Sequence, residues 1–127
     1  MDAYNPLQAP DPKEWGALDE SGRIYLVERF HRHARVKLPS VTAHAAIHAA
    51  VETQVAMGDE TPVRRTVERL MSEGLDRHDA VHAVGMALAA HMYDMVKRKS
   101  SSADPNAEYF ARVEKLTAKA WRESGQE

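Results

Sequence analysis

The 127-residue sequence contains no cysteine. Disulfide bonds, thiolate ligands and iron–sulfur clusters are therefore excluded, and the remaining donors for a metal ion are nitrogen and oxygen atoms, apart from methionine sulfur. Any metal ion bound by this chain must be held by histidine and carboxylate side chains.

The sequence also lacks a strong excess of charge and long apolar runs. Its formal net charge is −2, which gives no general attraction for nucleic acid or for an anionic membrane. No stretch approaches the ~20 apolar residues of a membrane span, and the amino terminus has no basic region followed by an apolar run. We therefore expect a bacterial-type cytoplasmic protein with no membrane partner and no nucleic-acid partner.

The chain length fits a single domain that spans residues 1–127. Residues 1–17 are rich in proline and predict an extended lead-in on the surface. Residues 18–99 are expected to form the core helices, and residues 100–127 a linker and a C-terminal helix. Because no strand-like alternation of useful length occurs, the predicted fold class is all-α, a compact bundle of about five helices.

Capping residues and glycines set the expected helix boundaries. Ser40, Thr61 and Asp76 are N-cap residues, and Gly58 and Gly74 are typical of the position that follows a helix. The predicted helices are Asp19–Val36, Ser40–Met57, a short helix that starts at Thr61–Pro62 and ends at Gly74, Asp76–Arg98, and one continuous helix from Asp104–Pro105 through Trp121.

Two histidine pairs at the same spacing are the most informative feature of the chain. His44 with His48 and His78 with His82 are each four residues apart, so the two imidazoles of a pair lie on one face of a helix. Glu52 continues the first face by one more turn. We predict a divalent metal site (zinc, iron, manganese or nickel) held by His44, His48, His78, His82 and Glu52 between the second and fourth helices.

The run HDAVH compares with H-E-x-x-H, in which two histidines bind zinc and the carboxylate acts as a base. Asp79 and Glu52 are therefore the candidate catalytic residues, which would act with a metal-bound water or with activated dioxygen. Leu88 stands where metzincin proteases have a third histidine, so a protease is not favoured. Asp79 also fits a capping box after Asp76, and the histidines themselves fit ordinary structural positions on an alanine-rich helix.

Two further histidines are open candidates. His31 lies on the inward stripe of the first helix and is a candidate fifth ligand, whereas His91 falls about 180° around the helix from His82. A hemerythrin-like site would match His48 with Glu52 and the second pair. It would need further ligands from another helix, for which only His31, or His91 with Asp94, is present.

The alternative function is a helical interaction module. Residues 63–85 have the helix, glycine-containing turn and helix of a helix-turn-helix motif, accompanied by Arg64, Arg65, Arg69 and Arg77. The second helix of this motif would offer His, Asp, Ala and Val to base edges, which argues against DNA. A protein-binding bundle or a homodimer remains open.

The order of short motifs also resembles a known family. The relevant residues are Pro39, His44, His48, Gln54, Pro62, Arg64, Arg65, the run His78-Asp79-Ala80-Val81-His82, Leu88 and Tyr93. Over residues 39–98 the chain resembles a divergent member of the bacterial domain of unknown function 1841 family. It departs in having Leu38 instead of asparagine, Thr53 instead of an acidic residue, Asp79 instead of glutamate, and a longer gap from the proline to the first histidine. The family has no assigned activity, so the resemblance implies the histidine site and no particular reaction.

Overall fold

The computed structural model describes residues 1–33, 41–98 and 104–124, and these parts contain seven α-helices and no strand. The predicted all-α class is confirmed. The helices are α1 (Pro12–Ala17), α2 (Glu20–His33), α3 (Val41–Ala56), α4 (Val63–Ser72), α5 (Arg77–Arg98), α6 (Pro105–Glu114) and α7 (Ala118–Glu123), with a 3₁₀ turn, η1 (Gly58–Glu60), between α3 and α4. Within the described parts of the chain, none of these helices has the length and apolarity that a membrane span requires.

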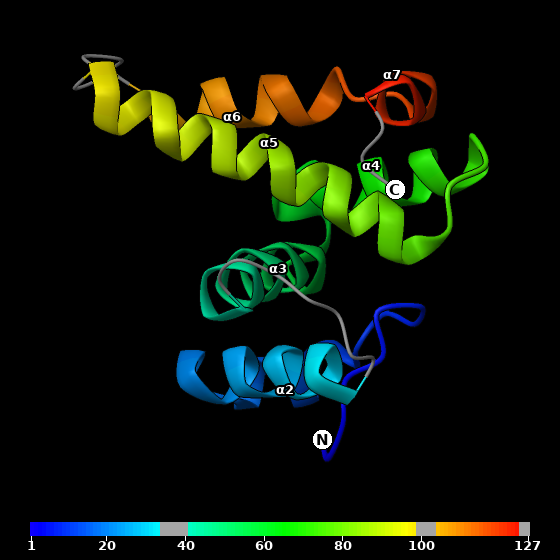
Figure 1. The fold of residues 1–127 in the computed structure, drawn as a ribbon, viewed down its shortest axis with the longest axis vertical. Coiled ribbons are helices and arrows are strands. Elements are labelled where there is room, and N and C mark those ends of the chain that lie inside the picture. The colour runs from blue at the N-terminus through cyan, green and yellow to red at the C-terminus, as the bar shows by residue number, and fades with distance from the viewer. Residues whose placement is uncertain (34–40, 99–103, 125–127) are drawn as a thin grey trace.

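Helix α3 lies in the middle of the molecule (Figure 1). Helices α1 and α2 pack on one side of it, and α4 and α5 pack on the other side. Helix α6 covers the outer face of α4 and α5, and α7 continues this layer (Figure 1). The two helices that carry the histidine pairs, α3 and α5, are therefore direct neighbours.

Two apolar clusters flank α3. The larger one joins α3 to the later helices and includes Val51, Leu70, Val84 and Val113, which are all fully buried. The smaller one joins α3 to α2 and the N-terminal segment through Tyr4, Trp15, Leu26, Val27, Ala45 and Ala49. The alanines on this side of α3 leave space for α2 to approach closely, as an alanine-rich helix allows.

The predicted turns at Gly58 and Gly74 and the predicted start of α5 after Asp76 agree with the structure. Gly58 and Gly74 both have positive φ angles, 65° and 110°, a conformation that glycine adopts without steric cost. The carboxylate of Asp76 accepts a hydrogen bond from the backbone N–H of Asp79 at 2.7 Å and caps α5. The predicted end of the first helix near Pro39 and the Ser40 cap lie outside the described residues.

The expectation of an extended surface lead-in over residues 1–17 is wrong in part. Pro12–Ala17 is helical because Asp11 accepts hydrogen bonds from the backbone N–H groups of Lys13 and Glu14, with proline at the first helical position. Trp15 of this helix is fully buried, and Tyr4 is only 5% exposed. The N-terminal segment is thus part of the core.

The single C-terminal helix expected from Asp104 is two helices. Helix α6 ends at Glu114, and Thr117 caps α7 by accepting from the N–H of Ala120 at 3.1 Å. The side chain of Glu73 also accepts from the N–H of Ala118 at 2.9 Å. These two acceptors satisfy the free N–H groups at the start of a new helix, which explains the break.

Replacing Asp76 with alanine should lower the free energy of unfolding by about 0.5–2 kcal/mol, since the start of α5 loses its side-chain acceptor. Urea unfolding followed by circular dichroism measures this change. Asp2→Ala, at an exposed aspartate outside the helices, is the control and should change stability by less than about 0.5 kcal/mol. Equal stability of the two variants would contradict the capping role.

Candidate metal centre

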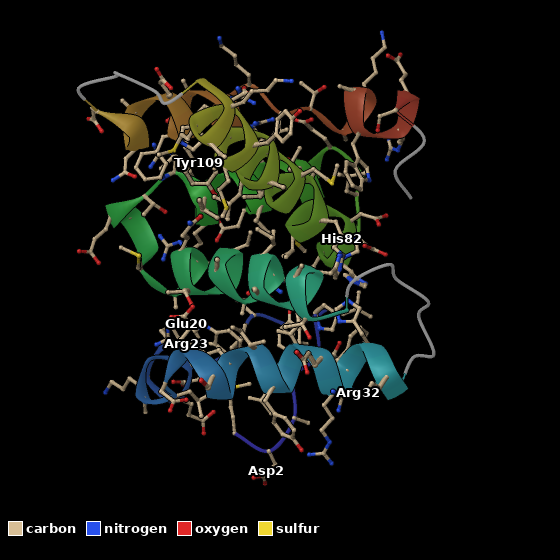
Figure 2. The ribbon with its side chains drawn as sticks, turned by 60° about the vertical axis from the view of Figure 1, so that its left-hand side comes forward. Asp2, Glu20, Arg23, Arg32, His82 and Tyr109 are labelled. Carbon is tan, nitrogen blue, oxygen red and sulfur yellow. The ribbon has the colours of Figure 1, made fainter. Side chains whose placement is uncertain are left out.

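Five histidines from three helices meet at one end of the α2, α3 and α5 packing. They are His31 from the last turn of α2, His44 and His48 from the first two turns of α3, and His78 and His82 from the first two turns of α5. Their rings are close neighbours: the centroids are 4.7 Å apart for His31 and His44, 5.4 Å for His48 and His78, and 4.3 Å for His78 and His82. Figure 2 shows His82 where the start of α5 faces the start of α3.

Four of these residues form a group of potential metal ligands. One ring nitrogen of each of His31, His48, His78 and His82 lies within 4.8 Å of the others, and this group of the described residues consists of histidines only. His44 lies beside the group, with its Nε2 atom 3.1 Å from Nε2 of His82. The structure thus brings both predicted pairs together, and it adds His31.

Hydrogen bonds on the outer side of two rings determine which nitrogen carries a lone pair. Nδ1 of His31 lies 2.8 Å from the carbonyl oxygen of Val27. Since a carbonyl only accepts, Nδ1 carries the proton and Nε2 is left with a lone pair. Nε2 of His48 lies 3.0 Å from the Tyr4 hydroxyl, which itself donates to the carboxylate of Glu52. Nε2 of His48 is therefore the donor, and its Nδ1 atom has the lone pair.

Three ring nitrogens of the cluster that make no hydrogen bond within the described residues are buried. Nε2 of His31, Nδ1 of His48 and Nε2 of His78 have no hydrogen-bond partner within the described parts of the chain. Buried polar atoms are almost always satisfied in folded proteins. Three such atoms on neighbouring rings are compatible with the binding of a metal ion by the cluster.

A buried ion pair lies behind His48. Arg77 donates two hydrogen bonds to the Glu52 carboxylate, at 2.8 and 2.7 Å, and a third to the carbonyl oxygen of Pro6 at 2.9 Å. Glu52 is 0% exposed and Arg77 is 5% exposed. Because both carboxylate oxygens are engaged by Arg77, Glu52 stands behind the histidines, and it reaches the cluster through the Tyr4 hydroxyl.

Four of the cluster imidazoles, those of His44, His48, His78 and His82, have lowered pKa values, which favours their neutral form. Burial, followed by the neighbouring histidines, lowers the pKa of His44 and His48. The same causes lower the pKa of His82 to about 3. Burial also lowers the pKa of His78, although Asp76 and Asp79 act in the opposite direction. Neutral imidazole is the form that binds a metal ion.

The remaining predicted residues, Asp79 and His91, are not members of the group of four histidines. Asp79 is half-buried in the first turn of α5, where its N–H bonds to Asp76. His91 is 5% exposed and packs against the ring of Tyr109 at 5.8 Å, on the other side of α5. Figure 2 shows that Tyr109 lies far from His82.

Sequence reasoning missed Tyr4 and Arg77 as parts of the site. Arg77 is the first residue of α5, where the helix dipole disfavours a positive charge. An arginine at this position is a weak sequence signal for a buried acidic partner. Nothing in the sequence pattern around Tyr4 indicates its hydrogen bonds to His48 and Glu52 on α3.

The helix-turn-helix alternative corresponds to α4, the turn at Gly74 and α5. The first turns of α5 are packed against α3, and its Ala80, Val81 and Val84 side chains are buried. Arg77 is engaged by Glu52, whereas Arg64, Arg65 and Arg69 are each paired with a carboxylate of this chain. The face of α5 that carries Ala80, Val81 and Val84 is therefore packed inside the protein.

Comparisons with known proteins add no relative: no family model matches the chain, and no match was found among curated proteins or among solved structures. The functional argument therefore depends on the geometry of the histidine cluster.

Proposed function

We propose that the protein binds one divalent transition-metal ion through His31, His48, His78 and His82. The observation that carries the proposal is the set of buried, unpartnered imidazole nitrogens that face one another from three helices. A tetrahedral ion with metal–nitrogen bonds of about 2.0–2.1 Å places its ligand atoms roughly 3.3 Å apart. The nitrogens lie within 4.8 Å of one another, so small side-chain rotations close the shell.

The chemistry of the donors narrows the choice of ion. Imidazole suits zinc, iron, nickel and copper, whereas manganese prefers carboxylate and water ligands. The predicted carboxylate ligand, Glu52, is engaged by Arg77 on both oxygens. An all-histidine shell favours zinc, iron or nickel over manganese, and zinc is the ion whose usual tetrahedral geometry matches four histidine ligands.

Tyr4, Glu52 and Arg77 have the role of an outer shell in this proposal. Metal-bound histidines commonly donate their other N–H to an oxygen atom, which fixes the tautomer and the ring orientation. Here the Tyr4 hydroxyl accepts from His48, and the Val27 carbonyl accepts from His31. Both rings are therefore held with a lone pair directed into the cluster.

An ion that takes a water as a fifth ligand beside the four histidines would lower the pKa of that water. The sequence predicts two catalytic carboxylates. Glu52 is held in a buried ion pair with Arg77, and Asp79 lies in the first turn of α5, where its N–H bonds to Asp76. His44 is neutral, half-buried and next to His82. In the proposed centre it is the side chain best placed to accept a proton.

The family resemblance over residues 39–98 stays a prediction.

The first test is elemental analysis of protein purified without a histidine tag. We expect near-stoichiometric transition metal, which is lost in the double variant His48→Ala/His82→Ala. His91→Ala, at a buried histidine outside the cluster, is the control and should retain the metal. Protein that carries no metal and fails to bind zinc or nickel after chelator treatment would end the proposal.

A second experiment separates the ligand set in the structure from the set that the sequence predicts. His31→Gln should weaken zinc affinity by more than about 100-fold, since a ligand contributes more than its outer-shell partners do. His44→Gln should have a smaller effect, because His44 lies beside the group. Zinc competition with a chromophoric chelator measures both. The reverse order would restore His44 as a ligand and remove His31.

A further inference from the structure

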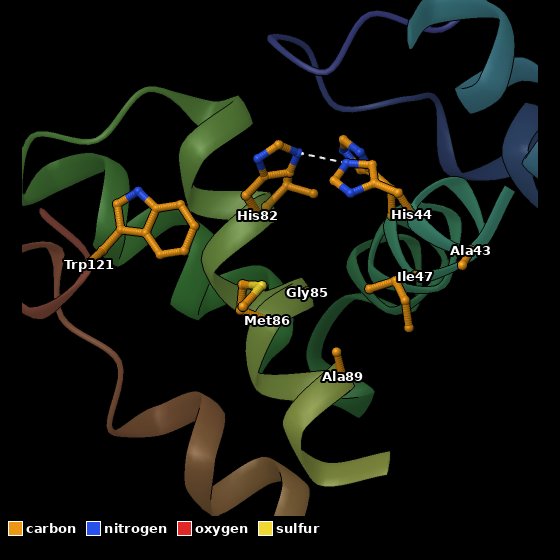
Figure 3. Close-up of a pocket in the computed structure, with 10 residues that line it drawn as sticks. Ala43, His44, Ile47, His82, Gly85, Met86, Ala89 and Trp121 are labelled. Atoms are coloured by element: carbon orange, nitrogen blue, oxygen red, sulfur yellow. Dashed lines mark hydrogen bonds between the residues drawn. The ribbon is translucent and has the colours of Figure 1, made fainter. Parts of the chain in front are cut away.

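A cavity of about 420 Å³ opens beside the histidine cluster, between α3 and α5. Figure 3 shows the imidazoles of His44 and His82 at one edge, with the Trp121 indole, Met86 and Ala89 around the remaining wall. A volume of this size falls in the range of small-molecule sites, about 300–1,000 Å³. The cavity therefore has room for a small ligand next to the proposed ion.

The wall of this cavity is apolar except at the histidine edge. None of its ten lining residues carries a carboxylate, an ammonium or a guanidinium group. Aliphatic side chains, the Met86 thioether and the Trp121 ring make up the remainder. A ligand that fits must carry its polar group at the end that faces His44 and His82, and an apolar body at the other end.

The charge of the proposed centre determines the sign of that polar group. All four potential ligands are histidines, which bind a metal ion without contributing a charge, and the charge of Glu52 is compensated by Arg77. A divalent ion in this shell keeps an uncompensated positive charge in apolar surroundings, which favours an anionic ligand. Phosphate is disfavoured because a second negative charge would need an arginine or lysine, and no such residue lines the cavity.

We propose that the cavity binds a small monocarboxylate with an unbranched apolar tail of about six carbons, whose carboxylate enters the metal shell beside His44 and His82 as a fifth ligand in addition to the four histidines. The tail lies along Met86 and Ala89 towards Trp121. This assignment rests on the proposed metal site and names the class of ligand that the site takes.

The test uses the full chain loaded with cobalt(II), whose visible spectrum reports ligands that enter the metal shell. Acetate, hexanoate and hexanol are titrated into the same sample. Each buried methylene strengthens binding by roughly fourfold, and the cavity is partly open. Hexanoate should therefore bind at least about tenfold more tightly than acetate and change the cobalt spectrum, whereas hexanol should leave the spectrum unchanged.

Two neighbouring alanines of α5 provide a matched pair of variants. Ala89 lines the cavity, and Ala90 is exposed outside it. Ala89→Leu fills the space for the tail and should weaken hexanoate binding about tenfold while acetate binding is retained. Ala90→Leu should leave both affinities unchanged. Isothermal titration calorimetry gives the constants, and the cobalt spectrum without ligand verifies that each variant holds metal.

The outcomes separate the two proposals. If cobalt and zinc do not bind, the metal centre itself is wrong. If the metal binds but acetate and hexanoate have equal affinity, or if Ala89→Leu behaves like Ala90→Leu, the metal centre stands and the cavity assignment is overturned. Hexanoate binding of equal strength to metal-free protein would also overturn it, because the carboxylate would then make no contact with the ion.

Discussion

Replacing Arg77 with methionine is expected to lower the free energy of unfolding by about 3–5 kcal/mol. The guanidinium and the Glu52 carboxylate are joined by two hydrogen bonds, and both side chains are almost fully buried. Removal of the arginine leaves a carboxylate in the interior with the Tyr4 hydroxyl as its remaining hydrogen-bond partner in the described structure. An uncompensated buried charge is one of the few single changes with an effect of this size.

Two comparisons make the measurement specific. Arg65→Met removes an arginine whose ion pair with Glu114 is more than half exposed on both sides, so it should cost less than about 1 kcal/mol. The double variant Glu52→Leu/Arg77→Met removes both charges and should recover much of the lost stability. Chemical denaturation of Arg77→Met, of the single variant Glu52→Leu and of the double variant gives the coupling between the two residues. A loss for Arg77→Met no larger than that for Arg65→Met would show that the pair is not buried in solution.

The same network connects stability to the metal centre. Tyr4→Phe removes the oxygen that accepts from Nε2 of His48 and should weaken metal affinity by about 10–100-fold, as loss of an outer-shell partner does. Tyr109→Phe is the matched control, because the Tyr109 hydroxyl bonds to Gln54 outside the cluster. Equal metal affinities in the two variants would contradict the role of Tyr4.

Local patterns were sufficient for much of the fold. The i, i+4 spacing of both histidine pairs depends only on helix geometry, and both pairs do share a face in the structure. The α5 start at Asp76 and the turns at Gly58 and Gly74 follow from capping chemistry and backbone sterics that operate within a few residues. These features need no knowledge of tertiary packing.

The composition of the cluster depended on tertiary packing. His31 joins it because α2 crosses α3 at the alanine face, and the sequence does not give the depth or direction of that crossing. The position of Glu52 was predicted correctly on the histidine face of α3, but its partners, Tyr4 and Arg77, are 48 and 25 residues away in sequence. From sequence alone, a carboxylate on the helix face that carries the histidines is equally consistent with a metal ligand and with one partner of an ion pair. Only the positions of its neighbours in the fold distinguish the two.

Acidification is expected to destabilise the metal-free protein from about pH 6.5 downward. The folded protein holds His48 and His82 neutral, since burial lowers the pKa of both, that of His82 to about 3. Unfolded chains take up these protons near pH 6.5, so the unfolded state binds more protons and gains stability as the pH falls. Well below pH 6.5, each such histidine costs about 1.4 kcal/mol per pH unit for as long as it stays neutral in the folded protein.

Bound metal should oppose this loss of stability, because a ligand that binds only the folded state stabilises it. Protons compete with the metal for the histidine nitrogens only when the pH approaches the lowered pKa values of these histidines. Melting curves followed by circular dichroism between pH 7.5 and pH 5, with chelator and with excess zinc, measure both effects. His48→Gln/His82→Gln removes the two titrating groups and should flatten the pH dependence of the chelated protein, whereas His91→Gln should retain it. Should the double variant lose stability with acid as steeply as the parent chain, the cluster would not be the source of the acid sensitivity. A zinc-independent melting temperature at pH 7.5 would count against the metal centre itself.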